Sequence, residues 1–173
     1  MFSSTEMENM GSTKTIRIER VDQPADPRAS VSVGTIDEEI TAEATATIEI
    51  GVKWNGDAAA LLFGKTVPIE LPCCCSRPET GLVLLSSPNG YERKMDEPEC
   101  WIPVLPANDD FGHPLGLMRR ETEKGETLSC RAEIWGDHRS ENPLEPGEYS
   151  FEETLSVEDE GYAKWGFTLR VET

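Results

Sequence analysis

The chain contains few basic residues. Its 173 residues include 16 Lys or Arg against 33 Asp or Glu, which gives a formal net charge of -17 at pH 7. Nucleic-acid binding depends on Lys and Arg gathered in a stripe, and none is present, so we expect no nucleic-acid partner. The acidic residues are spread along the whole chain. This spread favours adaptation to a salty cytoplasm, as in halophilic archaea, over an acidic surface that binds basic partners.

Long apolar runs are also absent. No stretch approaches the ~20 consecutive apolar residues that a membrane-spanning helix needs. Residues 1–12 lack the apolar segment of a secretory signal and contain Glu6 and Glu8. We therefore expect a cytoplasmic protein without membrane contact, a disordered tail over residues 1–12, and a single domain over residues 13–173. A domain of that length can bury a good core.

Motifs of the common catalytic sites are missing as well. No serine lies in a nucleophile elbow, and no dinucleotide fingerprint or glycine-rich phosphate loop is present; Gly64-Lys65 lacks the upstream glycine. The two histidines, His113 and His138, lie in loops near aspartates, a combination that can hold zinc or form a general base. The turn-rich composition of both loops favours solvated residues instead. The sequence predicts no enzyme.

Three consecutive segments near the C-terminus alternate apolar and polar residues. Side chains of a strand point to alternate faces, so each segment predicts a β-strand with one buried and one wet face. Short polar loops between them are typical of antiparallel pairing. Glu153 interrupts the second apolar row and predicts a bulge or a sheet edge. The three rows are Leu128, Cys130, Ala132 and Ile134; Tyr149, Phe151, Leu155 and Val157; and Trp165, Phe167, Leu169 and Val171.

The rest of the chain repeats this pattern less regularly. The strongest segment covers residues 41–55, and Asn55-Gly56 is a turn signal. Residues 58–63 predict a helical turn or a loop over one end of the fold, and residues 107–126 a long connection. Further strands are expected over residues 14–21, 29–34, 66–71, 82–85 and 101–105. About eight strands at this spacing predict an all-β fold, an antiparallel β-sandwich.

One turn carries a resemblance to a known type of domain. A strand that ends in Trp135 is followed by a polar loop and then by Pro146-Gly147-Glu148-Tyr149 at the start of the next strand. This arrangement resembles the late hairpin of immunoglobulin-like sandwiches and is most similar to the small intracellular proteinase inhibitors of that type. The resemblance implies an immunoglobulin-like fold and protease inhibition, but no inhibitory residue is carried over. The inter-sheet cysteine pair of antibody domains is absent.

Cys73-Cys74-Cys75 is an unusual run in a chain with five cysteines. Cytoplasmic thiols stay reduced, and adjacent cysteines do not match the spacing of structural zinc sites. In an extended segment Cys73 and Cys75 face one side, so together with Cys100 they form a candidate zinc or redox site. Small apolar filling at a strand end is the favoured interpretation, and we expect no cofactor. Cys130 lies in an apolar row and is predicted to be core.

The long connection contains the best candidate for a binding surface. Apolar side chains there lie beside two arginines in an otherwise acidic chain, a combination that protein interfaces use. A loop that covers a sheet edge is an equally good interpretation. The candidate partner-binding residues are Phe111, Leu115, Leu117, Met118, Arg119 and Arg120. We expect a non-enzymatic module that binds an unidentified protein, with a metal or redox protein as the alternative and homo-oligomerisation through sheet edges as a third hypothesis.

Overall fold

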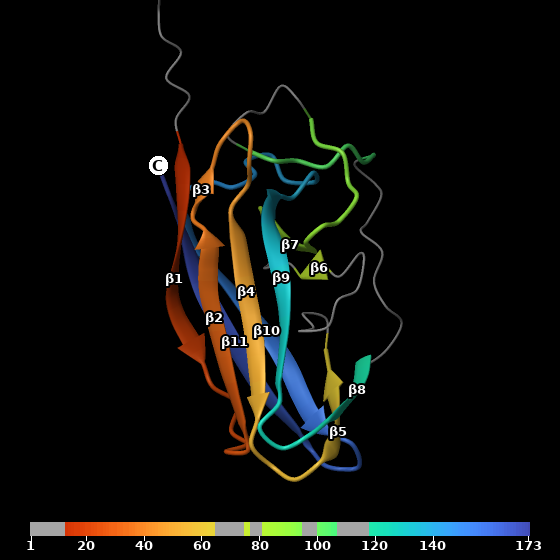
Figure 1. The fold of residues 1–173 in the computed structure, drawn as a ribbon. Helices are drawn as coiled ribbons and strands as arrows, with labels where there is room; N and C mark the ends of the chain where they lie inside the picture. Colours follow the sequence, from red (N-terminus) through yellow and green to blue (C-terminus); the bar gives the residue numbers. More distant parts are fainter. Residues whose placement is uncertain (1–12, 65–74, 77–80, 95–99, 107–117) are drawn as a thin grey trace, which may run out of the picture.

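The computed structural model describes residues 13–64, 75–76, 81–94, 100–106 and 118–173. Within these residues the fold is all-β, with two antiparallel sheets packed face to face (Figure 1), as predicted. The six-stranded sheet has the order β3 (Glu39–Ile40), β1 (Lys14–Asp22), β11 (Tyr162–Glu172), β10 (Gly147–Val157), β5 (Ala59–Phe63) and β8 (Met118–Thr122). The five-stranded sheet has the order β2 (Ala29–Asp37), β4 (Thr47–Trp54), β9 (Thr127–Gly136), β7 (Leu82–Ser86) and β6 (Cys75–Ser76). The part of the chain described here contains no helix able to cross a membrane.

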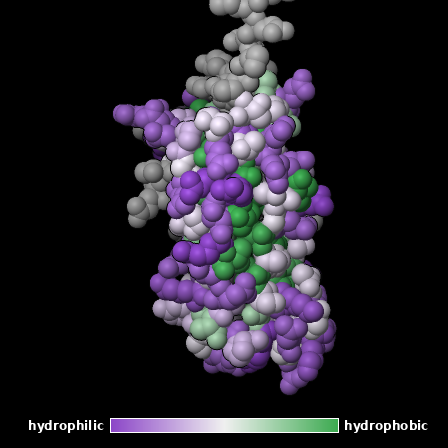
Figure 2. Space-filling model, turned by 90° about the vertical axis from the view of Figure 1, so that its left-hand side faces the viewer, coloured by the Kyte–Doolittle hydropathy of each residue, from purple (hydrophilic) through white to green (hydrophobic). Residues whose placement is uncertain are grey.

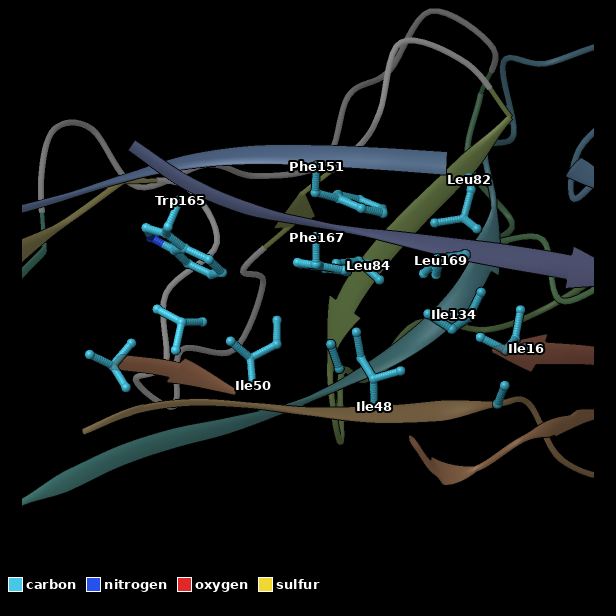
Figure 3. Packing of buried hydrophobic residues seen from close by; sticks show 14 of the residues in the cluster. Ile16, Ile48, Ile50, Leu82, Leu84, Ile134, Phe151, Trp165, Phe167 and Leu169 are labelled. Atoms are coloured by element: carbon cyan, nitrogen blue, oxygen red, sulfur yellow. The ribbon is translucent and has the colours of Figure 1, made fainter. Parts of the chain in front are cut away.

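The main core lies between the sheets and consists of the alternating apolar rows. Trp165, Phe167, Leu169 and Val171 of β11 are each at most 2% exposed. The Phe151 ring of β10 stacks on Phe167 with 4.8 Å between centroids, and Figure 3 shows these rings turned toward the isoleucines of β4. Each buried side chain of this size stabilises the fold by about 1.5–3 kcal/mol. The C-terminal hairpin therefore forms one wall of the core.

A second, smaller apolar cluster lies on the outer face of the five-stranded sheet. Val83 and Leu85 of β7 are fully buried there, together with Trp135 of β9. The Trp101 ring meets Trp135 edge-on, with 5.6 Å between centroids. The continuous apolar run of β7 is explained by this cluster, because both faces of that strand are covered.

Glu153 marks no bulge, because β10 pairs with β11 without a register shift. It lies where the ladder with β5 ends among the described residues, since that ladder pairs only Leu155, Ser156 and Val157 of β10. Glu153 itself is 7% exposed and continues the inward row. The irregularities lie elsewhere, between Ile18 and Arg20 on β1 and between Thr35 and Asp37 on β2. A polar residue in an apolar row does not by itself interrupt a ladder, because the backbone bonds do not depend on the side chain.

Residues 58–63 contain strand β5, whereas the sequence predicted a helical turn or a loop. β5 pairs with β10 on one side and with β8 on the other, and Leu61 and Phe63 are completely buried. A short apolar run does not distinguish helix from strand when its partners are distant in sequence. β5, β8 and the two-residue strands β3 and β6 account for the larger strand count. The strand predicted over residues 66–71 lies outside the described residues.

Two further strand predictions were wrong in extent. β4 begins at Thr47, because residues from Thr41 onward first make a local turn closed by backbone and hydroxyl bonds. Residues 101–105 form a single bridge, between Arg93 and Pro103, instead of a strand. Proline has no N–H with which to extend a ladder.

Candidate functional site

The structure places the described members of the predicted metal set apart. Cys75 pairs with Leu85 at one end of β7, whereas the buried Cys100 packs against Gly136, which pairs with the first residue of β7. Those positions differ by three residues along the strand, about 10 Å at the usual rise. Cys73 lies outside the described residues. Among the described side chains, no three or more His, Cys, Asp or Glu gather around a metal position.

Met118, Arg119 and Arg120 of the predicted binding surface form the start of β8. The Arg119 guanidinium lies 2.9 Å from the Glu158 carboxylate and is also paired with Glu121. Hydrogen bonds with these two acids raise the pKa of Arg119 above its usual value. Both partners belong to this chain, so the arginine is engaged within the fold. The predicted residues Phe111, Leu115 and Leu117 lie outside the described part of the chain.

His138 is buried rather than solvated, which corrects the sequence interpretation. Its side chain is 0% exposed, with Nδ1 at 3.7 Å from the carboxylate of Asp137. The cause is a folded-back loop: the backbone N–H groups of Asp137 and Leu144 both donate to the carbonyl of Gly81, at 3.2 and 3.0 Å. His113 lies outside the described residues.

Strand β2 is the longest free edge among the described strands. The six-stranded sheet ends at β3 and β8, and the five-stranded sheet ends at β2 and β6. Strand β2 has nine residues, whereas β8 has five and β3 and β6 have two each. Its sequence ASVSVGTID contains no Lys, Arg or Pro, which are the residues that usually protect an edge strand from pairing. An edge of this kind accepts an added strand.

The side-chain amide of Gln23 bonds to this edge as a neighbouring strand does. Its Nε2 donates to the carbonyl of Val31 at 2.7 Å, and the Val31 N–H donates to its Oε1 at 2.8 Å. Both backbone groups of Val31 therefore point away from β4. Alternation along an antiparallel ladder turns the N–H and C=O of Val33 and Thr35 the same way. The edge thus presents three alternate residues with strand-like polarity, and Gln23 occupies the first.

An apolar seam runs beside the edge, between the two sheets. Ile18 and Val21 of β1 and Val33 of β2 are partly buried and pack against the core. Figure 2 views this side of the molecule and shows an apolar strip between polar margins. Ile36, near the end of β2, is 41% exposed. A segment lying along β2 would cover these side chains with one of its faces.

The end of β2 is strongly acidic. Asp37, Glu38 and Glu39 follow one another and are all exposed. The hydroxyl of Thr35 lies 3.2 Å from a carboxylate oxygen of Glu38. Three adjacent carboxylates give this end of the strand a negative potential, in a chain whose net charge is -17.

Sequence reasoning missed this edge, because residues 29–34 predicted only a short strand. The available signal was the alternation of serine and valine without any basic residue or proline. An edge strand usually contains such residues, which protect it from pairing. The chain matches no protein-family model, no curated protein and no solved structure. Neither the immunoglobulin-like resemblance nor the inhibitor type gains support from these comparisons.

Proposed function

We propose that this protein is a non-enzymatic interaction module of a salt-adapted cytoplasm, which binds an extended segment of another protein along β2. Binding adds a strand to the five-stranded sheet, so main-chain hydrogen bonds supply affinity and alternate side chains supply specificity. The observation that carries the proposal is the pair of Gln23–Val31 bonds at 2.7 and 2.8 Å. A peptide-like group already fills one position of the incoming strand.

The partner segment alternates basic and apolar residues. Its apolar face covers Ile18, Val21 and Val33 along the seam, and its basic residues meet the carboxylates at the end of β2. In molar salt the Debye length falls to about 3 Å, so attraction over longer distances is screened. Under these conditions the segment is held by ion pairs in direct contact with the carboxylates and by hydrogen bonds between backbones.

The test uses a capped peptide of four Lys-Val repeats, titrated into the protein at low and at high KCl. We expect saturable binding, with slowed hydrogen exchange at the amides of Val33 and Thr35. Val33→Lys places a charge toward the seam and should weaken binding by about tenfold or more, which is ~1.4 kcal/mol. Met118→Lys is the matched control, because it adds the same charge at the opposite edge, and it should bind as the wild type does.

Three results would count against the addition of a segment of another protein at β2. The first is no binding of the peptide to the wild type. The second is equal loss in the Val33→Lys and Met118→Lys variants. The third is a mass that doubles with increasing KCl in light scattering and falls back to a monomer in Val33→Lys, because a second copy of the chain then occupies the edge.

A more specific form of the proposal is a proteinase inhibitor of the immunoglobulin-like type. The turn that carries the resemblance supports it, and so does Tyr149, whose hydroxyl donates to the carbonyl of Glu145 at 2.6 Å, four residues upstream. A tyrosine that bonds back to the upstream backbone is typical of immunoglobulin-like sandwiches. A panel of serine, cysteine and metalloproteases assayed with micromolar protein tests this form. Full activity of every protease would dispose of inhibition and leave strand addition standing.

A further inference from the structure

A pocket of about 500 Å³ opens where the β1–β2 connection meets the β10–β11 hairpin. This volume lies within the range of pockets that hold small molecules or large side chains. Trp54 lines it; this residue is 1% exposed, and the Arg28 guanidinium lies 5.0 Å from its ring centroid. Its apolar walls are Ala25, Pro27, Leu155, Val157, Tyr162 and Ala163.

The charged groups at this pocket are held in fixed positions. Arg28 donates to Asp26 at 2.7 Å and to Glu160 at 2.5 Å. These hydrogen bonds raise the pKa of Arg28 and lower the pKa values of Asp26 and Glu160, so all three groups are charged near neutral pH. Two carboxylates against one guanidinium leave one net negative charge beside an apolar cavity. That combination fits an apolar group that carries a nearby positive charge.

Tyr162 adds an exposed aromatic ring to the pocket. It is 69% exposed, although it begins strand β11, whose inward side chains are buried. Tyrosine is among the residues that contribute most when they become buried in interfaces. A ring in this position can close over a ligand that enters the pocket.

We infer that this pocket takes an apolar anchor side chain, flanked by a basic residue, from the segment that adds to β2. The pocket includes Arg28, and Val31 lies three residues further along the chain, about 10 Å in extended conformation. A segment paired with Val33 and Thr35 therefore reaches the pocket by displacing the Gln23 amide from Val31 and continuing past that residue. The anchor fills the space beside Trp54, and its basic neighbour faces Asp26 and Glu160. The identity of the partner rests on the proposed function, whereas the ligand chemistry of the pocket does not.

The pocket itself is tested with phenethylamine, which joins an aromatic ring to an ammonium group. The NMR signals to follow are the indole N–H of Trp54, which donates to the carbonyl of Asp57 at 2.8 Å, and the amides of Gly161 and Tyr162. We expect saturable shifts with millimolar affinity and about tenfold weaker binding of phenylacetate, which reverses the charge. Equal binding of the two compounds, or no shift, would overturn the inference.

Filling the pocket supplies the matched variants. Ala25→Trp places a large side chain in the cavity from an exposed loop position and should abolish the phenethylamine shifts. Ala42→Trp is the control, because it adds the same side chain at an exposed position outside the pocket, and it should leave the shifts unchanged. Retained binding in Ala25→Trp, or loss in Ala42→Trp, contradicts the assignment.

The link to β2 is tested by extending the Lys-Val peptide with Lys-Phe at one end or the other. One of the two extended peptides should bind about tenfold more tightly than its Lys-Ala counterpart, and Ala25→Trp should remove that gain. Val33→Lys should weaken all the peptides and leave phenethylamine binding intact. Absence of any gain from phenylalanine overturns the inference and leaves strand addition standing. Peptide binding that Val33→Lys does not weaken instead counts against the proposed function.

Discussion

The two sheets end in edges that differ in how they are protected. β8 is five residues long, and its Arg119 is held by Glu158 and Glu121. β2 is nine residues long, has no basic residue, and is covered at one position by the amide of Gln23. The sequence favoured the edge with arginines as the binding surface, whereas our proposal places binding at the edge without them. In an acidic chain an arginine beside apolar residues is readily neutralised by carboxylates of the same chain, so composition alone does not identify a binding edge.

The largest expected effect tests whether β2 is an edge at all. Ser32 lies in a pair that bonds to β4, whereas the N–H of Val33 points off the sheet. Ser32→Pro should therefore cost about 3 kcal/mol or more of unfolding free energy, because it removes a ladder bond and clashes with the neighbouring strand. Val33→Pro should cost clearly less. Urea unfolding of both variants measures the difference, and equal losses would show that both sides of β2 are paired.

The second prediction tests whether the Gln23 side chain covers the β2 edge or supports a binding site there. Gln23→Ala removes two hydrogen bonds to Val31, which should lower the unfolding free energy by about 1 kcal/mol. The same change opens the edge, so the Lys-Val peptide should bind several-fold more tightly. Urea unfolding and peptide titration on one preparation give both numbers. Loss of stability with weaker peptide binding would mean that Gln23 supports the site rather than covers it.

The smallest effect is expected at β8 and depends on pH. The hydrogen bond with Arg119 lowers the pKa of Glu158 below its usual value. A depressed carboxyl pKa stabilises the folded state above the unfolded pKa and loses that contribution as the pH falls through the folded value. Arg119→Ala should therefore destabilise slightly near pH 7 and have almost no effect near pH 3, or in molar KCl at either pH.

The loss of stability in Gln23→Ala should not depend on pH, in contrast to that in Arg119→Ala, because an amide does not titrate. Its cost should be the same near pH 7 and near pH 3, when each variant is compared with the wild type at the same pH. Unfolding curves of both variants at the two pH values complete the comparison. A Gln23→Ala cost that disappears with acid would imply that carboxylates, and not the amide, cover β2.

Much of the fold followed from local pattern. The apolar rows of β9, β10 and β11 were predicted residue by residue, and Trp165 and Phe167 are buried as expected. A strand was predicted over residues 82–85, where β7 lies, and this strand is covered on both faces. The predictions of secondary structure failed mainly for segments whose pairing strands are distant in the sequence. β5 was not predicted as a strand because β10 and β8, which pair with it, lie far away in the sequence.

Little of the candidate site was predictable for the same reason. The bonds from Gln23 to Val31 join residues only eight apart, yet their meaning depends on β2 being the last strand of its sheet. Arg28, which lines the pocket, is bonded to Glu160, 132 residues away. No periodicity in the sequence indicates such a contact.

The sequence by itself determined that alternate side chains of long segments are buried and that the surface is acidic. Both follow from properties that each residue carries with it: its direction on a strand and its charge. The tertiary structure alone decided which strand is left unpaired, which carboxylates neutralise which arginines, and where a pocket opens. Those outcomes depend on the order of strands in a sheet, and that order is set by pairing energies between segments that are remote along the chain.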